Sequence, residues 1–218
     1  MANVITVMFI VDFDDTLFDT HAFKQARLEA VKQVGVPEEI YWQTYREARN
    51  HSALFTYSNE RHAEMLALRG FSKEVVLRAL QSTTGEKIKR FLFSDAVAFL
   101  TFLKSYGDPL ILLSLGNQAM QELKVRGTKL YHYFDRVFYV DDTKEKVLQE
   151  LFNRTKPDTV WLFNDKVNEV KALKDVFPQM QVALRKSDSI SEDEYRAGGL
   201  PYFNSLTEIQ EYVKEHMG

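Results

Sequence analysis

Apolar residues along the chain fall into two kinds of pattern. Short runs that are rich in β-branched and other apolar residues indicate buried strands, and longer stretches with apolar residues three to four positions apart indicate helices. The expected strands are Val4–Val11, Pro109–Leu115, Arg136–Val140, Thr159–Phe163 and Gln181–Leu184. The expected helices interleaved with them are Ala96–Tyr106, Gln118–Arg126, Lys144–Asn153, Lys166–Phe177 and one that begins after Ser205. This alternation predicts an α/β fold, in which a Rossmann-like, doubly wound parallel sheet carries helices on both faces.

Polar residues just before several of these helices are of the types that cap helix N-termini. Asp95, Asn117 and Thr143 each precede an expected helix. Ser205 is followed three residues later by Glu208, which is the spacing of a capping box. These residues are therefore expected to accept hydrogen bonds from the first backbone N–H groups of the helices that follow them.

The segment from Phe18 to Phe91 interrupts the alternation, because it shows no strand pattern. Four helical stretches are expected there, at His21–Val34, Glu38–Asn50, Glu60–Arg69 and Lys73–Ser82. We interpret residues 18–91 as an inserted helical subdomain, with residues 1–17 and 92–218 forming the α/β core. The alternative is an elongated crossover lying flat on the sheet, but so many residues are hard to place on one sheet face.

The composition narrows the function classes. The chain has 218 residues, 28 Lys plus Arg, 31 Asp plus Glu and a formal net charge of −3, so a broad electrostatic grip on nucleic acid is not expected. The absence of cysteine excludes disulfides, thiolate metal sites and cysteine nucleophiles, and it fits a cytoplasmic protein. The apolar run before Asp12 is too short to span a bilayer and has no basic flank, so no membrane partner is expected.

The segment Asp12-Phe13-Asp14-Asp15-Thr16 places three acids directly after a buried strand. In an open parallel sheet, ligands bind at the carboxyl ends of the strands. If the chain turns there, Asp12 and Asp14 can face one small site, where their mutual repulsion calls for a cation. Mg²⁺ suits carboxylate and phosphate oxygens. The alternative interpretation is an acidic turn that only ends the strand.

Other polar residues end the neighbouring strands. Ser114 ends an apolar strand, and Asn117 follows it at the start of a helix, where a hydroxyl and backbone N–H groups can hold a phosphate. Lys144 lies at a helix start, which is mildly unfavourable unless an anion is near. Asp165 ends another apolar strand, and Glu169 follows four residues later. Each of these residues alone is compatible with a cap or a solvated position, but their order is a sharper signal.

This order resembles the haloacid dehalogenase-like hydrolase superfamily. The first motif of that family, Asp-x-Asp-x-Thr after a strand, corresponds to Asp12-Phe13-Asp14-Asp15-Thr16. The second, a strand ending in Ser or Thr, corresponds to Ser114. The third, a Lys at a helix start, corresponds to Lys144, with Lys146 as the competing choice. The fourth, a strand ending in an acid with another acid further on, corresponds to Asp165 and Glu169.

The resemblance covers residues 1–17 and 93–185, and the helical block at 18–91 is similar to a family cap inserted between the first two motifs. The fourth motif departs from the family pattern at two positions. Asn164 stands where Gly or Asp is common, and Glu169 stands where Asp is common. The longer side chain of Glu169 can still reach the site, but the metal geometry is harder to anticipate.

The resemblance also implies roles. Asp12 would be the nucleophile, and Asp14 would be the general acid and base, with a pKa that crowding by carboxylates is expected to raise. Mg²⁺ would be bound by Asp12, the backbone carbonyl of Asp14, and Asp165. The phosphate would be held by Thr16 of the first motif, which also braces the loop, by Ser114 and the nearby Asn117 of the second, and by Lys144 of the third. Glu169 would orient Lys144 or a metal-bound water.

We therefore expect a Mg²⁺-dependent phosphatase, a phosphoric monoester hydrolase acting on a small phosphorylated metabolite through an aspartyl-phosphate. A phosphomutase and a non-catalytic phosphate-binding or regulatory protein remain alternatives. A dehalogenase would not need an acid at position 14, and a phosphonate hydrolase would need a cap lysine such as Lys24 or Lys32. Either the cap residues Arg46, Arg49, His51, Phe55, Tyr57, Arg61 and His62 grip an anionic or ring-bearing leaving group, or they form a solvated face with core aromatics. The two histidines are expected at the surface, and the sequence leaves the oligomeric state open.

Overall fold

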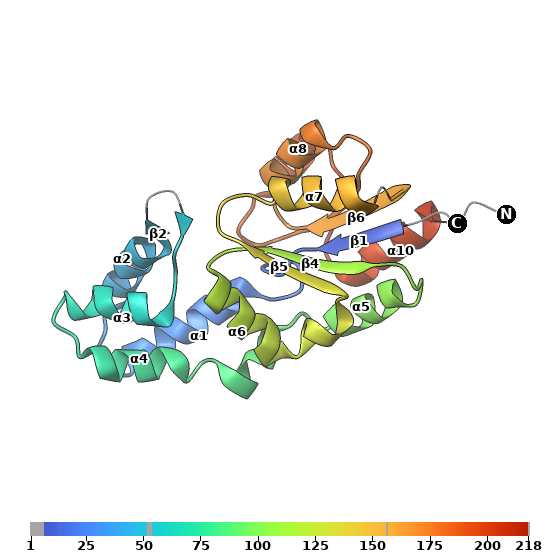
Figure 1. Cartoon of the computed structure of the whole chain (residues 1–218). Coiled ribbons are helices and arrows are strands. Elements are labelled where there is room, and N and C mark those ends of the chain that lie inside the picture. Colours follow the sequence, from blue (N-terminus) through green and yellow to red (C-terminus); the bar gives the residue numbers. More distant parts are fainter. Residues whose placement is uncertain (1–6, 52–53, 156, 218) are drawn as a thin grey trace.

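A six-stranded parallel sheet forms the centre of the protein. The computed structural model describes residues 7–51, 54–155 and 157–217. The strand order is β5-β4-β1-β6-β7-β8, and all paired strands are parallel (Figure 1). The strands are β1 (Val7–Val11), β4 (Leu110–Leu115), β5 (Arg136–Val140), β6 (Thr159–Asn164), β7 (Gln181–Arg185) and β8 (Tyr202–Phe203). The expected α/β fold is confirmed. The first three residues of the strand expected at Val4–Val11 lie outside the described residues.

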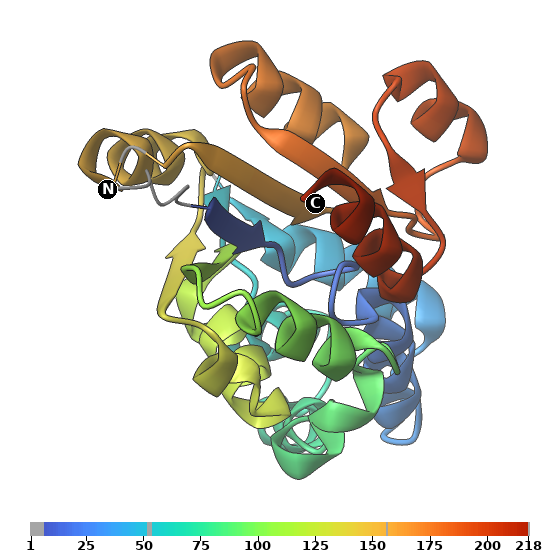
Figure 2. The ribbon, with the colours of Figure 1, turned by 90° about the vertical axis from the view of Figure 1, so that its right-hand side faces the viewer.

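Successive strand residues pack into two different apolar cores, one on each face of the sheet, as the two-residue repeat of a strand requires. On β1, Val7, Phe9 and Val11 join one core, and Met8 and Ile10 join the other. The first core is covered by α5 (Ala96–Lys104), α6 (Gln118–Thr128) and α10 (Leu206–His216), and the second by α7 (Glu145–Thr155), α8 (Val167–Val176) and α9 (Glu192–Gly198). Figure 2 shows the two helical layers on either side of the strands.

Four helices between β1 and β4 form a separate block beside the carboxyl end of the sheet (Figure 1). They are α1 (Thr20–Lys32), α2 (Glu38–Arg49), α3 (Asn59–Ala67) and α4 (Lys73–Gln81), and we call this block the cap. The cap has its own apolar core, which includes Leu28, Val31, Tyr41, Leu66 and Leu80. The 3₁₀ helix η1 (Gly85–Phe91) leads the chain back to the sheet, and a second one, η2 (Leu130–Tyr133), precedes β5.

The cap also contains a short antiparallel hairpin, β2 (Asn50–His51) with β3 (Leu54–Phe55). The expectation of no strand between residues 18 and 91 is therefore wrong. Each strand has only two residues, which is too short for an alternating pattern to appear in the sequence. The structure adds β8 and α9 as well, which the sequence pattern did not indicate, and both are short.

The chain leaves the core and returns to it along two adjacent segments. Phe18 pairs with Leu92 across an antiparallel bridge, and the Asp19 N–H donates to the Phe91 carbonyl at 2.7 Å. The rings of Phe18, Phe23 and Phe91 pack edge to face at this crossing. The division into a core (1–17 and 92–218) and a cap (18–91) stays a prediction, and its two boundaries fall at this crossing.

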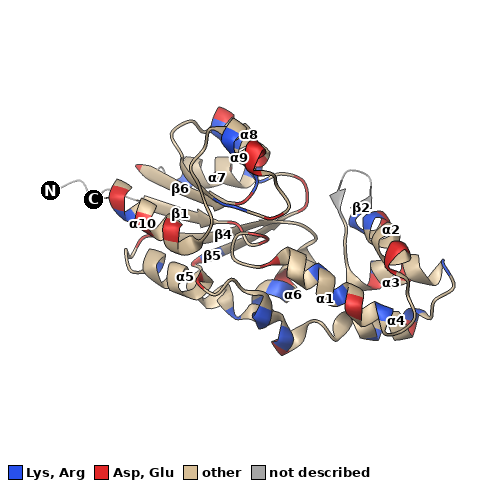
Figure 3. Cartoon of the chain, turned by 180° about the vertical axis from the view of Figure 1, so that it is seen from behind, with Lys and Arg blue, Asp and Glu red and all other residues tan. Residues whose placement is uncertain are grey.

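Helix starts agree with the sequence at three of four positions. Asn117, Thr143 and Ser205 each accept a backbone N–H from the helix that follows. Asp95 does not cap its own helix; its carboxylate accepts from the Leu206 N–H at 2.9 Å and so fastens α10 to α5. Acidic and basic residues are interspersed over the helices (Figure 3). In the described part of the chain, no helix is long and apolar enough to cross a membrane.

Candidate active site

The carboxyl ends of three neighbouring strands bring together the residues of the first, second and fourth motifs. Asp12 follows β1, Ser114 lies near the end of β4, and Asp165 follows β6. Because β1 is hydrogen-bonded to both β4 and β6, these three side chains meet at one edge of the sheet. All three are buried, with at most 4% of each residue exposed. The edge is therefore a shielded polar site at the place where open parallel sheets bind ligands.

Lys144, which lies between β5 and α7, also reaches this edge. Its Nζ donates to Asp12 Oδ1 at 2.7 Å and to Glu169 Oε2 at 3.1 Å. Burial alone would lower the pKa of Lys144, but the two carboxylates outweigh it and raise the pKa. Burial raises the pKa of Asp12, against the opposing effect of Lys144. The pair places a fixed positive charge beside the carboxylate that would act as nucleophile.

The choice between the two lysines of the third motif follows from their positions. Lys144 is 1% exposed and reaches Asp12. Lys146 instead pairs with Asp142 at 2.8 Å, and its side chain is 77% exposed. Lys144 is thus the lysine that faces the site.

The Asp14 side chain is held by three other side chains. Lys124 Nζ lies 2.5 and 2.6 Å from its two carboxylate oxygens, and Gln121 and Thr20 each donate to it at 2.7 Å. Burial alone would raise the pKa of Asp14, but these donors lower it to about 2. The expectation of a raised pKa is wrong, because the contacts of Asp14 are with a cation and hydrogen-bond donors rather than with carboxylates.

Lys124 and Gln121 are the site residues that the sequence reasoning missed. Both lie on α6, whose cap residue is Asn117, and the spacing 117, 121, 124 puts the three on one face of the helix. Lys124 and Gln121 are also buried, at 5% and 3% exposure. The sequence did contain a signal for them, because polar residues share one helix face directly after the second motif.

Two buried polar atoms at the edge have no hydrogen-bond partner among the described residues: Ser114 Oγ and Asp165 Oδ1. Unpaired buried polar atoms are costly, so both are suited to a ligand. Burial, together with the nearby Asp12 charge, raises the pKa of Asp165 well above its ordinary value. A cation between Asp12 and Asp165 would remove that repulsion, and an anion at Ser114 would accept a hydrogen bond from its hydroxyl.

These residues fit Mg²⁺, although the fit is not that of a ready-made carboxylate cage. Among the residues that the structure describes, no three His, Asp or Glu side chains converge as a metal cluster. Mg²⁺ usually keeps several waters and binds one or two carboxylates. Asp12, Asp165 and the Asp14 backbone carbonyl make such a set, since the Asp14 side chain is already engaged by Lys124.

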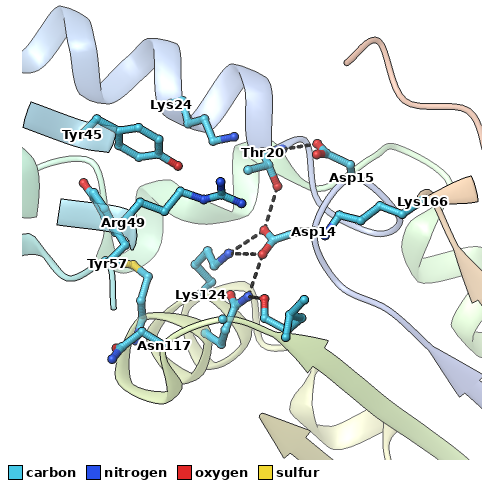
Figure 4. Close-up of a pocket in the computed structure, with 14 residues that line it drawn as sticks. Asp14, Asp15, Thr20, Lys24, Tyr45, Arg49, Tyr57, Asn117, Lys124 and Lys166 are labelled. Atoms are coloured by element: carbon cyan, nitrogen blue, oxygen red, sulfur yellow. Dashed lines mark hydrogen bonds and ion pairs between the residues drawn. The ribbon is translucent and has the colours of Figure 1, made fainter. Parts of the chain in front are cut away.

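A cavity of about 130 Å³ lies between Asp14 and the cap, and its lining does not include Asp12, Ser114, Lys144 or Asp165. Its core side includes Asp14, Asn117, Lys124 and Lys166, and its cap side includes Thr20, Lys24, Tyr45, Arg49 and Tyr57 (Figure 4). Thr16 does not line it. The Thr16 hydroxyl is buried 3.5 Å from Asp12 Oδ2, so it braces the carboxylate rather than the backbone.

The two histidines of the cap were both expected at the surface. His62 is fully buried, so its expected surface position is wrong. Its ring nitrogens contact Thr44 Oγ1 at 3.1 Å and the Tyr57 hydroxyl at 3.0 Å. The side chain of His51 lies outside the described residues.

The family model of the haloacid dehalogenase-like hydrolases matches residues 8–176, which includes every motif residue of this edge. The chain belongs to this family. A glyceraldehyde 3-phosphate phosphatase of Methanothermobacter thermautotrophicus is 29% identical to it over 176 residues, which is 72% of this chain and 76% of that protein.

Solved structures show the same fold. A Burkholderia xenovorans LB400 protein assigned to the haloacid dehalogenase-like hydrolases has a TM-score of 0.76 at 17% identity, covering 98% of this chain and 99% of that one. A Thermotoga maritima protein assigned as a β-phosphoglucomutase has a TM-score of 0.67 at 17% identity, covering 96% of this chain and 99% of that one. At these identities the likeness shows the fold alone.

In this hydrolase, the two departures in the fourth motif are in contact with each other. Asn164 Nδ2 donates to Glu169 Oε2 at 2.8 Å, and Asn164 Oδ1 accepts from the Asp165 N–H at 2.8 Å. Asn164 therefore fixes both the Asp165 loop and the Glu169 carboxylate. The extra length of Glu169 is used to reach Lys144.

Proposed function

We propose that the protein is a Mg²⁺-dependent phosphatase that hydrolyses a small phosphorylated metabolite through an aspartyl-phosphate on Asp12. The observation that carries the proposal is the sheet edge itself. A buried carboxylate, Asp12, lies against Lys144, with the unpartnered Ser114 Oγ nearby. A second carboxylate, Asp14, follows two residues later, where a dehalogenase has no need of one. The Methanothermobacter relative, a glyceraldehyde 3-phosphate phosphatase, supports a small phosphorylated substrate.

In this proposal Asp12 Oδ attacks phosphorus, and the bond from phosphorus to the leaving oxygen breaks. Ser114 Oγ and Lys144 Nζ bind phosphate oxygens and stabilise the charge that develops on them. Bound Mg²⁺, held by Asp12, Asp165 and the Asp14 carbonyl, supplies positive charge that screens the anionic nucleophile from the anionic substrate. Glu169 keeps Lys144 oriented through their 3.1 Å ion pair.

Asp14 handles the proton. In the structure it is an ionised carboxylate, so the proton for the leaving oxygen has to come through its partner Lys124, whose ammonium contacts both carboxylate oxygens. In the second step water attacks phosphorus, the Asp12–phosphate bond breaks, and Asp14 accepts the proton of that water and returns it to Lys124, which restores the ammonium. Lys124 is therefore a positioning residue for Asp14.

The test is a metal-depletion assay with product identification. The purified protein is assayed with 4-nitrophenyl phosphate and with a panel of small phosphate esters, and released inorganic phosphate is measured. Activity should vanish in excess EDTA and return with Mg²⁺. Full activity in EDTA would contradict the metal role. A moved rather than released phosphate would identify a mutase, chloride release from 2-chloropropionate would identify a dehalogenase, and no turnover of any ester would leave only a binding protein.

A further inference from the structure

Two lysines of the cavity come from opposite sides of it. Lys24 lies on α1 in the cap, and Lys166 lies in the core directly after Asp165. Figure 4 shows both side chains, together with Arg49 at the end of α2, extending toward the same space beside Asp14. The side chains come from three separate elements, so their convergence does not arise from one charged helix face.

Neither lysine has a carboxylate within ion-pair distance in the described part of the chain. Lys24 Nζ lies 5.8 Å from the centre of the Tyr45 ring, and burial lowers its pKa despite the attraction of Asp15 and Asp14. Lys124, in the same cavity, shows the contrast, because it is bonded to Asp14 through both oxygens. A half-buried ammonium without an ion-pair partner has lost hydration that an anionic ligand would replace.

Asp15 is one of the acids that face these cations, and it is already engaged. It lines the cavity with Lys24 and Lys166, and its Oδ1 accepts from the Thr20 N–H at 3.1 Å. Asp14 is engaged by Lys124. Asp165, Glu169 and Glu194 line a neighbouring cavity with the same cations, but in the described part of the chain none of these acids lies within ion-pair distance of Lys24 or Lys166. The two lysines therefore keep positive charge that no ion pair neutralises, which favours an anion in the space between them.

We propose that the substrate is a small phosphate monoester whose leaving group carries a second anionic group, a carboxylate or a further phosphate, bound by Lys24 and Lys166 at the cap–core cavity. This inference rests on the proposed phosphatase function and names its substrate class. The cavity of about 130 Å³ and a neighbouring cavity of about 360 Å³ share Lys24, Arg49 and Lys166 as lining residues, so a short anionic tail fits beside the two lysines.

The experiment compares three-carbon phosphate esters that differ in the charge of the tail. The Mg²⁺-loaded protein is given glycerol 3-phosphate and glyceraldehyde 3-phosphate as neutral-tail esters, 3-phosphoglycerate as the carboxylate, and propane-1,3-diyl bisphosphate as the second phosphate. We expect kcat/KM to be at least about 10-fold higher for one of the anionic-tail esters than for the neutral ones, as for a charge-assisted hydrogen bond. Whichever anionic ester is preferred identifies the group.

Variants of one helix supply the matched pair. Lys24→Gln should remove most of the preference for the anionic tail, because its loss in kcat/KM is larger for charged than for neutral esters. Lys24→Glu should reverse the preference, toward ethanolamine phosphate. Lys32→Gln is the control, since Lys32 lies at the exposed end of the same helix and pairs with Glu29; it should leave the preference unchanged. Thermal unfolding of each variant reports whether it is folded.

The outcomes separate this inference from the function on which it rests. If neutral esters are hydrolysed as well as anionic ones, or if Lys24→Gln keeps the full preference, the second-anion inference is overturned and the phosphatase function stands. If no ester is hydrolysed while the protein is folded, the proposed function fails and the inference fails with it.

Discussion

The sheet edge and the cap each bury a cation, but they neutralise it in opposite ways. Lys144 at the edge is bonded to two carboxylates, Asp12 and Glu169. Arg27 in the cap is equally buried, and its guanidinium donates to neutral groups, the Tyr57 hydroxyl at 2.6 Å and Asn59 Oδ1 at 2.5 Å, with the rings of Phe23 and Tyr57 alongside. The edge thus pairs its buried cation with opposite charges, whereas the cap surrounds its buried cation with neutral polar groups and aromatic rings.

The edge and the cap also differ in the hydrogen bonds that their buried polar atoms make. At the edge, Ser114 Oγ and Asp165 Oδ1 have no hydrogen-bond partner among the residues that the structure describes. In the cap, the chain of hydrogen bonds runs from Arg27 through Tyr57, His62 and Thr44 to the Ile40 carbonyl. Since Thr44 donates to that carbonyl, it accepts from His62 Nε2–H, and His62 Nδ1 accepts from Tyr57. Arg27 Nε also has no partner among the described residues, but the hydroxyl and imidazole groups of the cap network all bond to one another. Substitutions should therefore affect stability in the cap and activity at the edge.

The largest effect should come from Asp12→Asn, which removes the nucleophile while keeping the shape of the side chain. We expect turnover of 4-nitrophenyl phosphate to fall by at least about 10⁴-fold. The fold should survive, because Lys144 keeps Glu169 as a partner and the amide oxygen can still accept its proton. The free energy of unfolding should change by no more than about 2 kcal/mol. Steady-state assays and urea unfolding measure the two effects, and wild-type turnover in the variant would exclude the covalent mechanism.

The next effect concerns the fourth motif, where two acids should be unequal. Asp165→Asn removes a carboxylate whose Oδ1 is unpartnered, so the Mg²⁺ concentration that gives half-maximal activity should rise more than 100-fold, a loss we expect to exceed that at Glu169. Glu169→Gln keeps the shape and the contact with Asn164, and it should cost about 10–100-fold, as for residues that orient metal ligands. The measurement is a Mg²⁺ titration of each variant. Equal shifts would make Glu169 a direct ligand, and no shift in either would move the metal elsewhere.

The residues of the candidate site differ in how far the sequence could predict them. Asp12, Ser114 and Asp165 follow from buried strands of a parallel sheet, because the topology alone brings the strand ends together. Lys124 lies 110 positions from Asp14, and their contact depends on the rotation of α6 about its axis, which no local pattern fixes. The pKa of Asp14 was anticipated with the wrong sign for that reason.

In the cap, the helices were expected close to their actual bounds, because their apolar spacing is local. The burial of His62 was not, since it depends on how α3 packs against α2 and on the position of Tyr57. The hairpin β2–β3 is only two residues per strand, and side-chain alternation cannot be detected over that length. Tertiary packing, rather than sequence period, decides each of these features.

The third effect tests the cap through the pH dependence of stability. Burial, with Arg27 nearby, lowers the pKa of His62 to about 3. The unfolded state, with an ordinary pKa of about 6.5, therefore binds a proton that the folded state does not, and stability is lost as the pH falls from about 6 to 3. The slope from this group should reach about 1.4 kcal/mol per pH unit.

His62→Gln should reduce that slope by about one proton, and His132→Gln, at an exposed histidine, should not. Urea unfolding at pH 4, 5, 6 and 7 measures the slope in each protein. At pH 7.5 the activity of His62→Gln should fall far less than that of Asp12→Asn. An unchanged slope in His62→Gln would mean that the ring binds a proton as readily inside the cap as in the unfolded chain.

The smallest effect should come from Lys146→Met, and it distinguishes the two lysines of the third motif. The ion pair of Lys146 with Asp142 is exposed, and such pairs contribute between zero and about 1 kcal/mol, so stability should change by no more than about 1 kcal/mol. Activity should be unchanged, because the Lys146 side chain points into solvent. Lys144→Met is the matched variant on the same stretch of chain, and it removes the cation that both Asp12 and Glu169 contact. That variant should lose activity at every Mg²⁺ concentration, since added metal cannot replace an ammonium bound to phosphate. If Lys146→Met is the damaging change and Lys144→Met is tolerated, Lys144 is only the counter-ion of a buried acidic pair, and the phosphate is bound by a different group.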